Sequence, residues 1–172
     1  MTTNKSNPEG GKGYGKLKKL QTIDEILHTA IGFEKTARDF YSDLTATVSK
    51  PLRGLIQELA DEEAEHYRLF TELRERDDIQ QHINQSIQTP PNDHRFSDYL
   101  QLPDLGKNPS DQDILLYALG REQAAMEQYS ALAEKAPAGA IAELFQYLAN
   151  EELEHKKELE KLYYQVVHSG GV

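Results

Sequence analysis

The sequence has 172 residues, no cysteine, and a formal net charge of −10 at pH 7. The lack of cysteine excludes disulfides, thiolate zinc sites, iron–sulfur clusters and a cysteine nucleophile, and the acidic balance argues against nucleic acid as a partner, because phosphate contacts need a basic surface. The sequence contains no apolar run of membrane-spanning length and no apolar signal core at its N-terminus, which predicts a cytoplasmic protein without a membrane partner.

Two helices are predicted in the first half of the chain. Residues 1–20 precede them, carry five lysines and one glutamate among several glycines, and are predicted to be a flexible basic tail. Apolar residues then recur at helical spacing over residues 22–48 and again over residues 51–76. Pro51 follows the break between the two segments and suits the first position of a helix. We therefore predict a helical hairpin.

A long linker separates this hairpin from a second one. Residues 77–110 contain four prolines, and their first part is predicted to extend the second helix or to form a short helix. A third helix is predicted from Ser110, a good capping residue, and a fourth over residues 137–167. A helix of about 26 residues is about 39 Å long. The linker can cover that length, so the second hairpin can start at the opposite end of the bundle.

A near repeat in the second and fourth helices carries the chemistry. Residues 59–66 read LADEEAEH and residues 148–155 read LANEELEH. Each copy holds a Glu-x-x-His pair, Glu63 with His66 and Glu152 with His155. Residues three apart lie on one face of a helix, so each pair can present a carboxylate and an imidazole to one point. One such pair is commonly a solvated surface pair, but two pairs in matching contexts indicate two halves of one metal site.

The first and third helices each add a glutamate at a matching position. Glu34 precedes Tyr41 by seven residues, and Glu122 precedes Tyr129 by seven residues. Both glutamates interrupt an apolar stripe, where a core residue belongs. Counted from the hairpin turns, they lie at nearly the same depth as the Glu-x-x-His pairs. The total of four glutamates and two histidines is the ligand set of di-iron and di-manganese carboxylate bundles.

A site of this composition suits two metal ions rather than one. Four buried carboxylates need compensating charge, which two divalent cations can supply. Oxygen and imidazole ligands without sulfur favour iron or manganese, with zinc as a substitute. Glu62 and Glu151 are candidates for the rim of the site. Tyr41 and Tyr129 either pack in the core with a satisfied hydroxyl or hydrogen-bond to a ligand carboxylate.

In these motifs and in its long crossover, the chain resembles the rubrerythrin branch of the ferritin-like superfamily over about residues 22–167. The resemblance implies an all-α, ferritin-like four-helix bundle over residues 21–168, made of two helical hairpins joined by the 77–110 crossover. It also implies a non-haem di-iron centre, often in a homodimer. The iron ligands carried over by the motif are Glu34, Glu63, His66, Glu122, Glu152 and His155.

The resemblance implies a peroxidase that reduces hydrogen peroxide at a carboxylate-bridged di-iron centre. Rubrerythrins typically add a four-cysteine rubredoxin-like domain, so this chain needs a separate electron donor, a rubredoxin-like protein or a flavoprotein. They also usually carry a further glutamate one turn after the third-helix ligand, where this chain has Ala125. That departure favours an alternative, a ferroxidase that oxidises Fe(II) with oxygen in iron handling. A hydroxylase and a structural zinc bundle are further alternatives.

Overall fold

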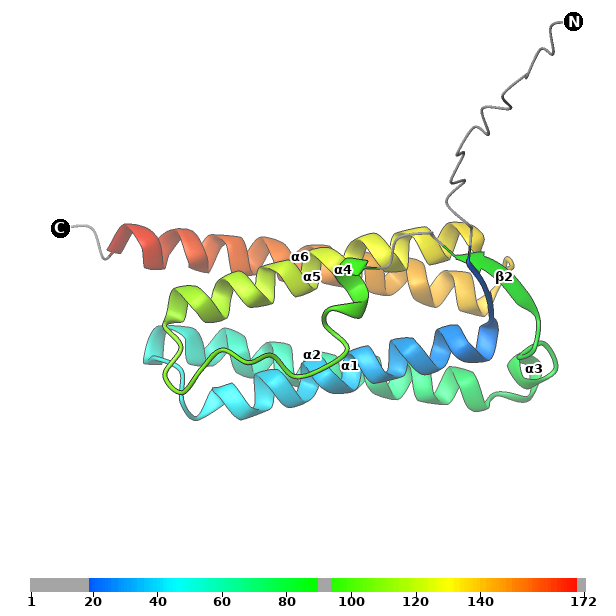
Figure 1. The fold of residues 1–172 in the computed structure, drawn as a ribbon, viewed down its shortest axis with the longest axis horizontal. Coiled ribbons are helices and arrows are strands. Elements are labelled where there is room, and N and C mark those ends of the chain that lie inside the picture. Colours follow the sequence, from blue (N-terminus) through cyan, green and yellow to red (C-terminus); the bar gives the residue numbers. More distant parts are fainter. Residues whose placement is uncertain (1–18, 90–93, 170–172) are drawn as a thin grey trace, which may run out of the picture.

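Four long helices make up most of the computed structural model, which describes residues 19–89 and 94–169. They are α1 (Ile23–Thr45), α2 (Lys50–Glu75), α5 (Asp111–Lys135) and α6 (Ala140–Ser169). Figure 1 shows α1 paired with α2 and α5 paired with α6, the two hairpins lying side by side. The predicted all-α, ferritin-like bundle is confirmed. No helix among the described residues combines the length and hydropathy that crossing a lipid bilayer requires.

Local sequence sets where the long helices begin. Thr22 starts α1 with a reciprocal cap, in which its hydroxyl accepts from the Glu25 N–H and the Glu25 carboxylate accepts from the Thr22 N–H. Ser110 and Asp113 start α5 in the same way. These caps satisfy N–H groups that the first turn of a helix leaves free. The predicted boundaries therefore agree with the structure to within a few residues.

The crossover contains more structure than the sequence indicated. After α2 the chain forms α3 (Asp77–Gln80), the short helix foreseen as one option, then β2 (Ser86–Thr89) and α4 (His94–Ser97). Strand β2 pairs antiparallel with β1 (Lys19–Thr22), with Thr22 opposite Ser86. The predicted tail of residues 1–20 is thus wrong at its end, because residues 19 and 20 belong to this ribbon. Residues 1–18 lie outside the described part of the chain.

The contacts that attach the crossover to the bundle include an aromatic stack and a hydrogen bond. The ring of Phe96 stacks on that of Phe33, with centroids 4.1 Å apart, and the Thr36 hydroxyl donates to the Leu100 carbonyl over 2.9 Å. The segment then runs back along the bundle to the end where α1 turns into α2 (Figure 1). There the Ser49 hydroxyl donates to Asp111 over 2.6 Å. This bond joins the α1–α2 turn to the first residue of α5.

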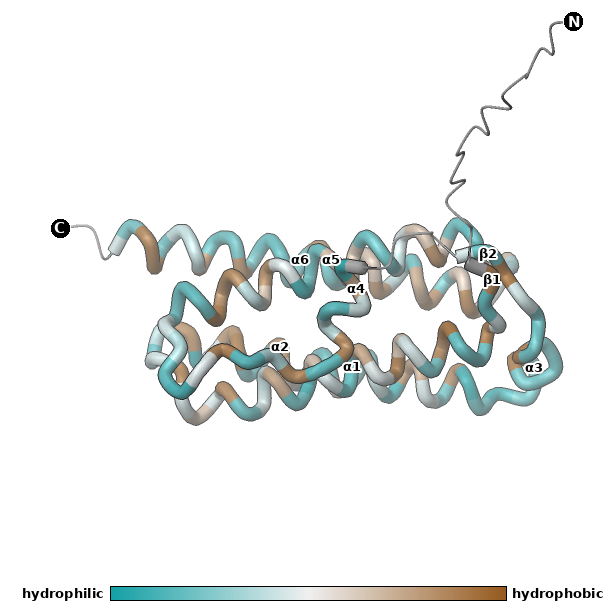
Figure 2. The backbone as a smooth tube through the Cα atoms, in the orientation of Figure 1, coloured by the Kyte–Doolittle hydropathy of each residue, from teal (hydrophilic) through white to brown (hydrophobic). Residues whose placement is uncertain are grey.

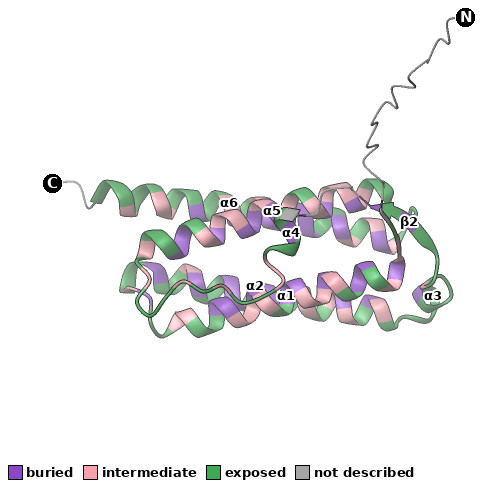
Figure 3. Cartoon of the chain, viewed as in Figure 1, coloured by how far each residue is buried: buried purple, intermediate pink, exposed green. Residues whose placement is uncertain are grey.

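The apolar core is divided into two clusters. One gathers Phe33, Phe70 and Phe145 towards the ribbon end of the bundle. The other gathers Leu52 and Leu115 towards the opposite end. The hydropathy in Figure 2 and the burial in Figure 3 show that the apolar, buried positions of the long helices face inward. A set of buried polar side chains lies between the two clusters, in the middle of the bundle.

Replacing Phe96 by alanine tests the crossover attachment. Phe96 is 4% exposed, and removing a buried aromatic ring typically costs about 3 kcal/mol or more. We expect the free energy of unfolding, measured by urea denaturation, to fall by that amount. Leu102→Ala in the same segment is the control, since Leu102 is 55% exposed and surface changes stay within about 0.5 kcal/mol. Equal losses in both variants would contradict the attachment.

Candidate metal centre

Six acidic and imidazole side chains meet inside the bundle, and the long helices each contribute at least one. The four glutamates are fully buried, and the two histidines are 2% and 3% exposed. They comprise Glu34 from α1, Glu63 and His66 from α2, Glu122 from α5, and Glu152 and His155 from α6. All six residues singled out in the sequence therefore lie together.

The six residues form two overlapping groups. Glu34, His66, Glu63 and Glu152 each offer one atom to the first group, and within it these atoms lie within 4.8 Å of one another. Glu122 and His155 combine with the same Glu63 and Glu152 in the second group, within the same limit. Each group thus has one glutamate and one histidine of its own and two shared carboxylates. This arrangement can hold two cations side by side.

The imidazoles present their Nδ1 atoms to the carboxylates. His66 Nδ1 lies 3.3 Å from Glu152 Oε1 and 3.5 Å from Glu34 Oε2. His155 Nδ1 lies 3.1 Å from Glu152 Oε2 and 3.6 Å from Glu63 Oε1. The two rings are nearly parallel, with centroids 5.7 Å apart and planes inclined by 17°. The two ends of the cluster therefore have the same composition and similar geometry.

Several atoms that face the centre lack a hydrogen-bond partner. One carboxylate oxygen of each glutamate and one imidazole nitrogen are buried and unsatisfied: Glu34 Oε2, Glu63 Oε1, His66 Nδ1, Glu122 Oε2 and Glu152 Oε1. Buried polar atoms are otherwise almost always paired, and leaving one unpaired is costly. Cations bound between these oxygen and nitrogen atoms would satisfy them, so the residues fit a metal pair.

Two tyrosines hold the outer oxygens of the unshared glutamates. The Tyr41 hydroxyl donates to Glu122 Oε1 over 2.5 Å, and the Tyr129 hydroxyl donates to Glu34 Oε1. Each bond crosses from one hairpin to the other, and both rings are fully buried. The sequence left open whether these tyrosines only pack in the core or hydrogen-bond to a ligand carboxylate. In the structure both make such a hydrogen bond. Each tyrosine fixes one carboxylate oxygen and leaves the other, Oε2, directed to the centre.

Sequence reasoning missed Arg121, a buried cation beside the cluster. Its side chain is 1% exposed and lies 3.3 Å from Glu122 Oε1 and 3.5 Å from Glu63 Oε2. The guanidinium also packs 4.1 Å from the centroid of the Phe33 ring. A signal was present, because Arg121 falls on the stripe of Ala118 and Ala125 and interrupts it as the glutamates do. Its charge offsets part of the cost of burying the carboxylates.

A rim carboxylate contacts only one of the two histidines. Glu62 is half-exposed, and its carboxylate is in close contact with His155 Nε2. A carboxylate on the second nitrogen of an imidazole fixes its tautomer and orientation. The repeat places Glu151 in the equivalent position in the other half, yet no matching ion pair joins it to His66 among the described residues. The two halves of the centre are therefore not equivalent at the rim.

Burial shifts the proton affinities of the cluster. It raises the pKa of Glu63 to about 8, although the charge of Arg121 opposes this, and it raises the pKa of Glu152 to about 7. For Glu122 burial is outweighed by the neighbouring carboxyl group of Glu152 and by the charge of Arg121, and its pKa is lowered. Burial is also outweighed at His66 and His155, where carboxylate neighbours raise the pKa. Without metal, the cluster therefore retains protons.

Comparisons with known proteins agree with this description. The family model described as Rubrerythrin matches residues 25–105 and 113–169. A solved structure described as a dodecameric thioferritin, the bacterioferritin-related protein from Bacteroides fragilis, is similar with a TM-score of 0.59. It is 17% identical in sequence, and the match covers 86% of this chain and 88% of that one. No significant match was found among curated proteins. At this sequence identity, the structural similarity indicates a shared fold and nothing further.

The retained protons predict how the stability of the metal-free protein depends on pH. Glu63, Glu152, His66 and His155 bind protons more tightly in the folded state than in the unfolded state. Their contribution to the stability of the folded protein is therefore complete at pH values below their pKa in the unfolded state. It is lost as the pH rises through their pKa in the folded state. We expect the Tm, followed by circular dichroism, to fall from about pH 5 to about pH 8, between the ordinary glutamate pKa of 4.5 and that of buried Glu63.

Glu122 contributes with the opposite sign, because its lowered pKa gives stability that is present above the ordinary value and lost only as pH falls below it. The control is the zinc-loaded protein, in which cations replace the protons and the fall should vanish. A Tm of the metal-free protein that rises over the same range would contradict the proton retention.

Proposed function

Because the chain belongs to the rubrerythrin family, we propose that its buried centre holds two iron ions and serves a di-iron oxidoreductase. The observation that carries the proposal is the pair of four-residue groups that share Glu63 and Glu152. Two carboxylates common to both groups can bridge two ions, whereas a single ion would leave two terminal residues without a role. The bundle core is also where such carboxylate proteins build their sites.

The roles of the ligands follow from this sharing. Glu34 and His66 would hold one ion and Glu122 and His155 the other, and Glu63 and Glu152 belong to both groups. Ligands with oxygen and nitrogen donors and no sulfur suit iron or manganese, and zinc can substitute. Iron, when bound, would supply the redox chemistry by giving and accepting one electron per ion.

Arg121 changes the charge of the filled centre. Four ionised carboxylates and one guanidinium, all buried, carry three net negative charges, so two divalent cations would leave one net positive charge. A buried positive charge favours an anionic ligand, and interactions at such a dry site are stronger than in water. This charge would favour the approach of a small anion to the filled centre. Arg121 contributes this positive charge although its side chain is buried.

We propose hydrogen peroxide as the oxidant, with electrons from a separate donor because this sequence has no cysteine for a rubredoxin-type iron site. The role of the protein is to hold the carboxylates at fixed geometry through Tyr41 and Tyr129 and to exclude water with the two apolar clusters. The second candidate is a ferroxidase that uses oxygen. Ala125 supports it, since this buried methyl group gives α5 no further ligand.

The assembly state also belongs to the proposal. The family resemblance favours a homodimer, whereas the similar structure is described as dodecameric. We propose that this chain forms an oligomer, with the homodimer as the expected form. Light scattering on the purified protein would distinguish the dimer from a dodecamer and from a monomer.

Replacing a shared or an unshared glutamate tests the ligand assignment. We expect Glu152→Ala to weaken the binding of both ions and Glu34→Ala to weaken the binding of one. Removing a residue that only supports a ligand lowers metal affinity by about 10–100-fold, and we expect a larger loss when a ligand itself is removed. Isothermal titration with Mn²⁺, followed by metal analysis, gives the stoichiometry and affinity. Glu154→Ala is the control, because Glu154 is exposed and pairs with Lys157. Two tight ions in Glu152→Ala would refute the shared role.

Rapid mixing tests the oxidant. The anaerobic iron(II) protein is mixed separately with hydrogen peroxide and with oxygen, and the ferric absorbance is followed. We expect peroxide to oxidise the centre at least about tenfold faster, a difference of about 1.4 kcal/mol in activation free energy. Comparable or faster oxidation by oxygen would instead favour the ferroxidase. No ferric absorbance with either oxidant would contradict both candidates.

A further inference from the structure

We propose that Tyr41, Phe40 and Tyr117 form an electron-transfer path that joins the buried centre to the surface beneath the crossover. The inference rests on the proposed function, because it requires redox-active ions at the centre. It adds a route for electrons to a site whose ligands are almost completely buried and which a separate donor cannot touch.

The inner end of the path is bonded to the centre. Tyr41 is fully buried, and its hydroxyl donates to Glu122 Oε1 over 2.5 Å. The other oxygen of Glu122 belongs to one of the two candidate metal groups. One carboxylate group therefore separates the phenol from the position of an ion.

Aromatic rings continue outward from Tyr41 without a gap. The Tyr41 and Phe40 ring centroids are 5.1 Å apart, and those of Phe40 and Tyr117 are 4.7 Å apart. Tyr99 follows at 5.2 Å from Tyr117. Electron transfer through protein weakens exponentially with distance, so a chain of touching rings couples the two tyrosines better than open space would. Phe40 serves as the bridge between two oxidisable phenols.

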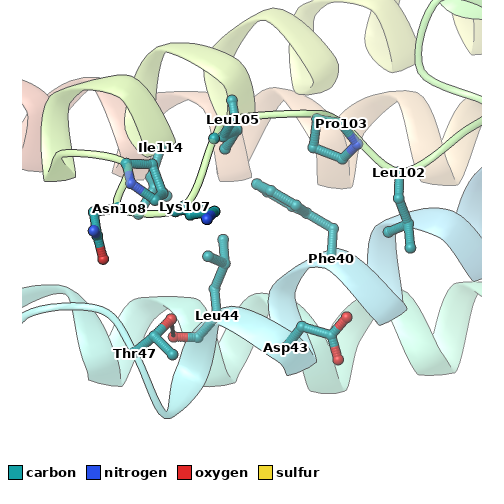
Figure 4. Close-up of a pocket in the computed structure, with 12 residues that line it drawn as sticks. Phe40, Asp43, Leu44, Thr47, Leu102, Pro103, Leu105, Lys107, Asn108 and Ile114 are labelled. Carbon is teal, nitrogen blue, oxygen red and sulfur yellow. Dashed lines mark hydrogen bonds between the residues drawn. The ribbon is translucent and has the colours of Figure 1, made fainter.

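The outer end is accessible and is fixed by packing. Tyr117 and Tyr99 are partly exposed, and Phe40 lines a surface pocket of about 430 Å³ between α1 and residues 102–109 of the crossover (Figure 4). Gly120 leaves room for the Tyr99 hydroxyl, which a Cβ at that position would strike. Glycine weakens a helix interior, so its presence here indicates that the close approach of Tyr99 to α5 is useful.

In the duplicated half, no chain of rings among the described residues leads from the matching tyrosine to a partly exposed tyrosine. Tyr129 occupies the equivalent position and donates to Glu34. Its ring neighbours within the described residues, however, are all buried phenylalanines: Phe33, Phe70, Phe96 and Phe145. The repeat therefore explains a tyrosine beside each terminal glutamate, but it does not explain the aromatic chain that leads only from Tyr41 to the surface.

Electrons and protons balance along the path. For inward transfer, Tyr41 gives one electron to the centre and its hydroxyl proton to Glu122. Tyr117 then gives an electron to Tyr41, which recovers its proton from Glu122, while the Tyr117 proton passes to solvent. A one-electron donor of the reduced-flavin class at the surface reduces Tyr117, which takes a proton back from solvent. The net change is one electron transferred from the donor to the centre.

A photochemical experiment measures the path without any oxidant substrate. The sequence has no cysteine, so Asp98→Cys, at an exposed position next to Tyr99, gives a single attachment point for a ruthenium photosensitiser. The labelled protein is loaded anaerobically with iron(II), and its iron content is measured. A flash with a sacrificial acceptor then oxidises the sensitiser, and the rise of ferric absorbance gives the rate of electron transfer out of the centre.

We expect Tyr117→Phe and Phe40→Leu each to slow this transfer by about tenfold or more, which corresponds to about 1.4 kcal/mol in activation free energy, with the iron content unchanged. Tyr117→Phe keeps the ring and should leave the Tm unchanged as well, whereas Phe40→Leu lowers it because Phe40 is buried. Tyr117→Trp restores an oxidisable ring and should recover the rate. Tyr164→Phe is the control, since Tyr164 is 65% exposed on α6 and packs only on His168 among the described rings.

The two proposals fail in different ways. Unchanged transfer in both Tyr117→Phe and Phe40→Leu, with two irons per chain, would overturn the path and leave the proposed function intact. Fewer than two irons per chain in the labelled parent protein would overturn the proposed function and the path with it. A rate that falls equally in Tyr164→Phe would also overturn the path, because the loss would then be general.

Discussion

The burial of four carboxylates in the middle of a helical bundle is the constraint on which the rest of the structure depends. Removing such groups from water costs several kcal/mol each unless charge and hydrogen bonds compensate. The structure supplies one buried guanidinium, Arg121, two tyrosine hydroxyls and two imidazoles. This compensation is incomplete, since one oxygen of each glutamate remains unpaired. The arrangement therefore fits bound cations, and without them the cluster holds protons instead.

The fold supports this centre by separating it from solvent at both ends. One apolar cluster lies on the ribbon side and the other on the side of the α1–α2 turn, so the polar groups sit where water has least access. The crossover completes the enclosure by packing Phe96 on Phe33, the same ring that lies beneath the Arg121 guanidinium. A segment remote in sequence thus helps to hold the buried cation beside Glu63 and Glu122.

Departures from the internal repeat are as informative as the repeat itself. The duplicated hairpin provides symmetric ligands, and the symmetry explains why two matching groups share two carboxylates. Arg121 contacts Glu122 and the shared Glu63 but, among the ion pairs of the described residues, not Glu34. Within the same residues, Glu62 contacts His155 without a counterpart at His66, and an aromatic chain leads outward from Tyr41 but not from Tyr129. A pair of ions held here would therefore have unequal surroundings, which suits chemistry in which electrons enter from one side.

The sequence by itself determined the four long helices, the cap at Ser110 and the six residues that converge, because helical periodicity and the Glu-x-x-His spacing are local properties. Only the tertiary structure decided which glutamates are shared, which carboxylate oxygen each tyrosine holds, and that Arg121 is buried against Glu63. The ribbon between β1 and β2 was not foreseeable either, since two four-residue strands have no period to detect and their partners lie more than sixty residues apart. These features depend on contacts between distant segments, whose geometry is set by packing of the whole bundle.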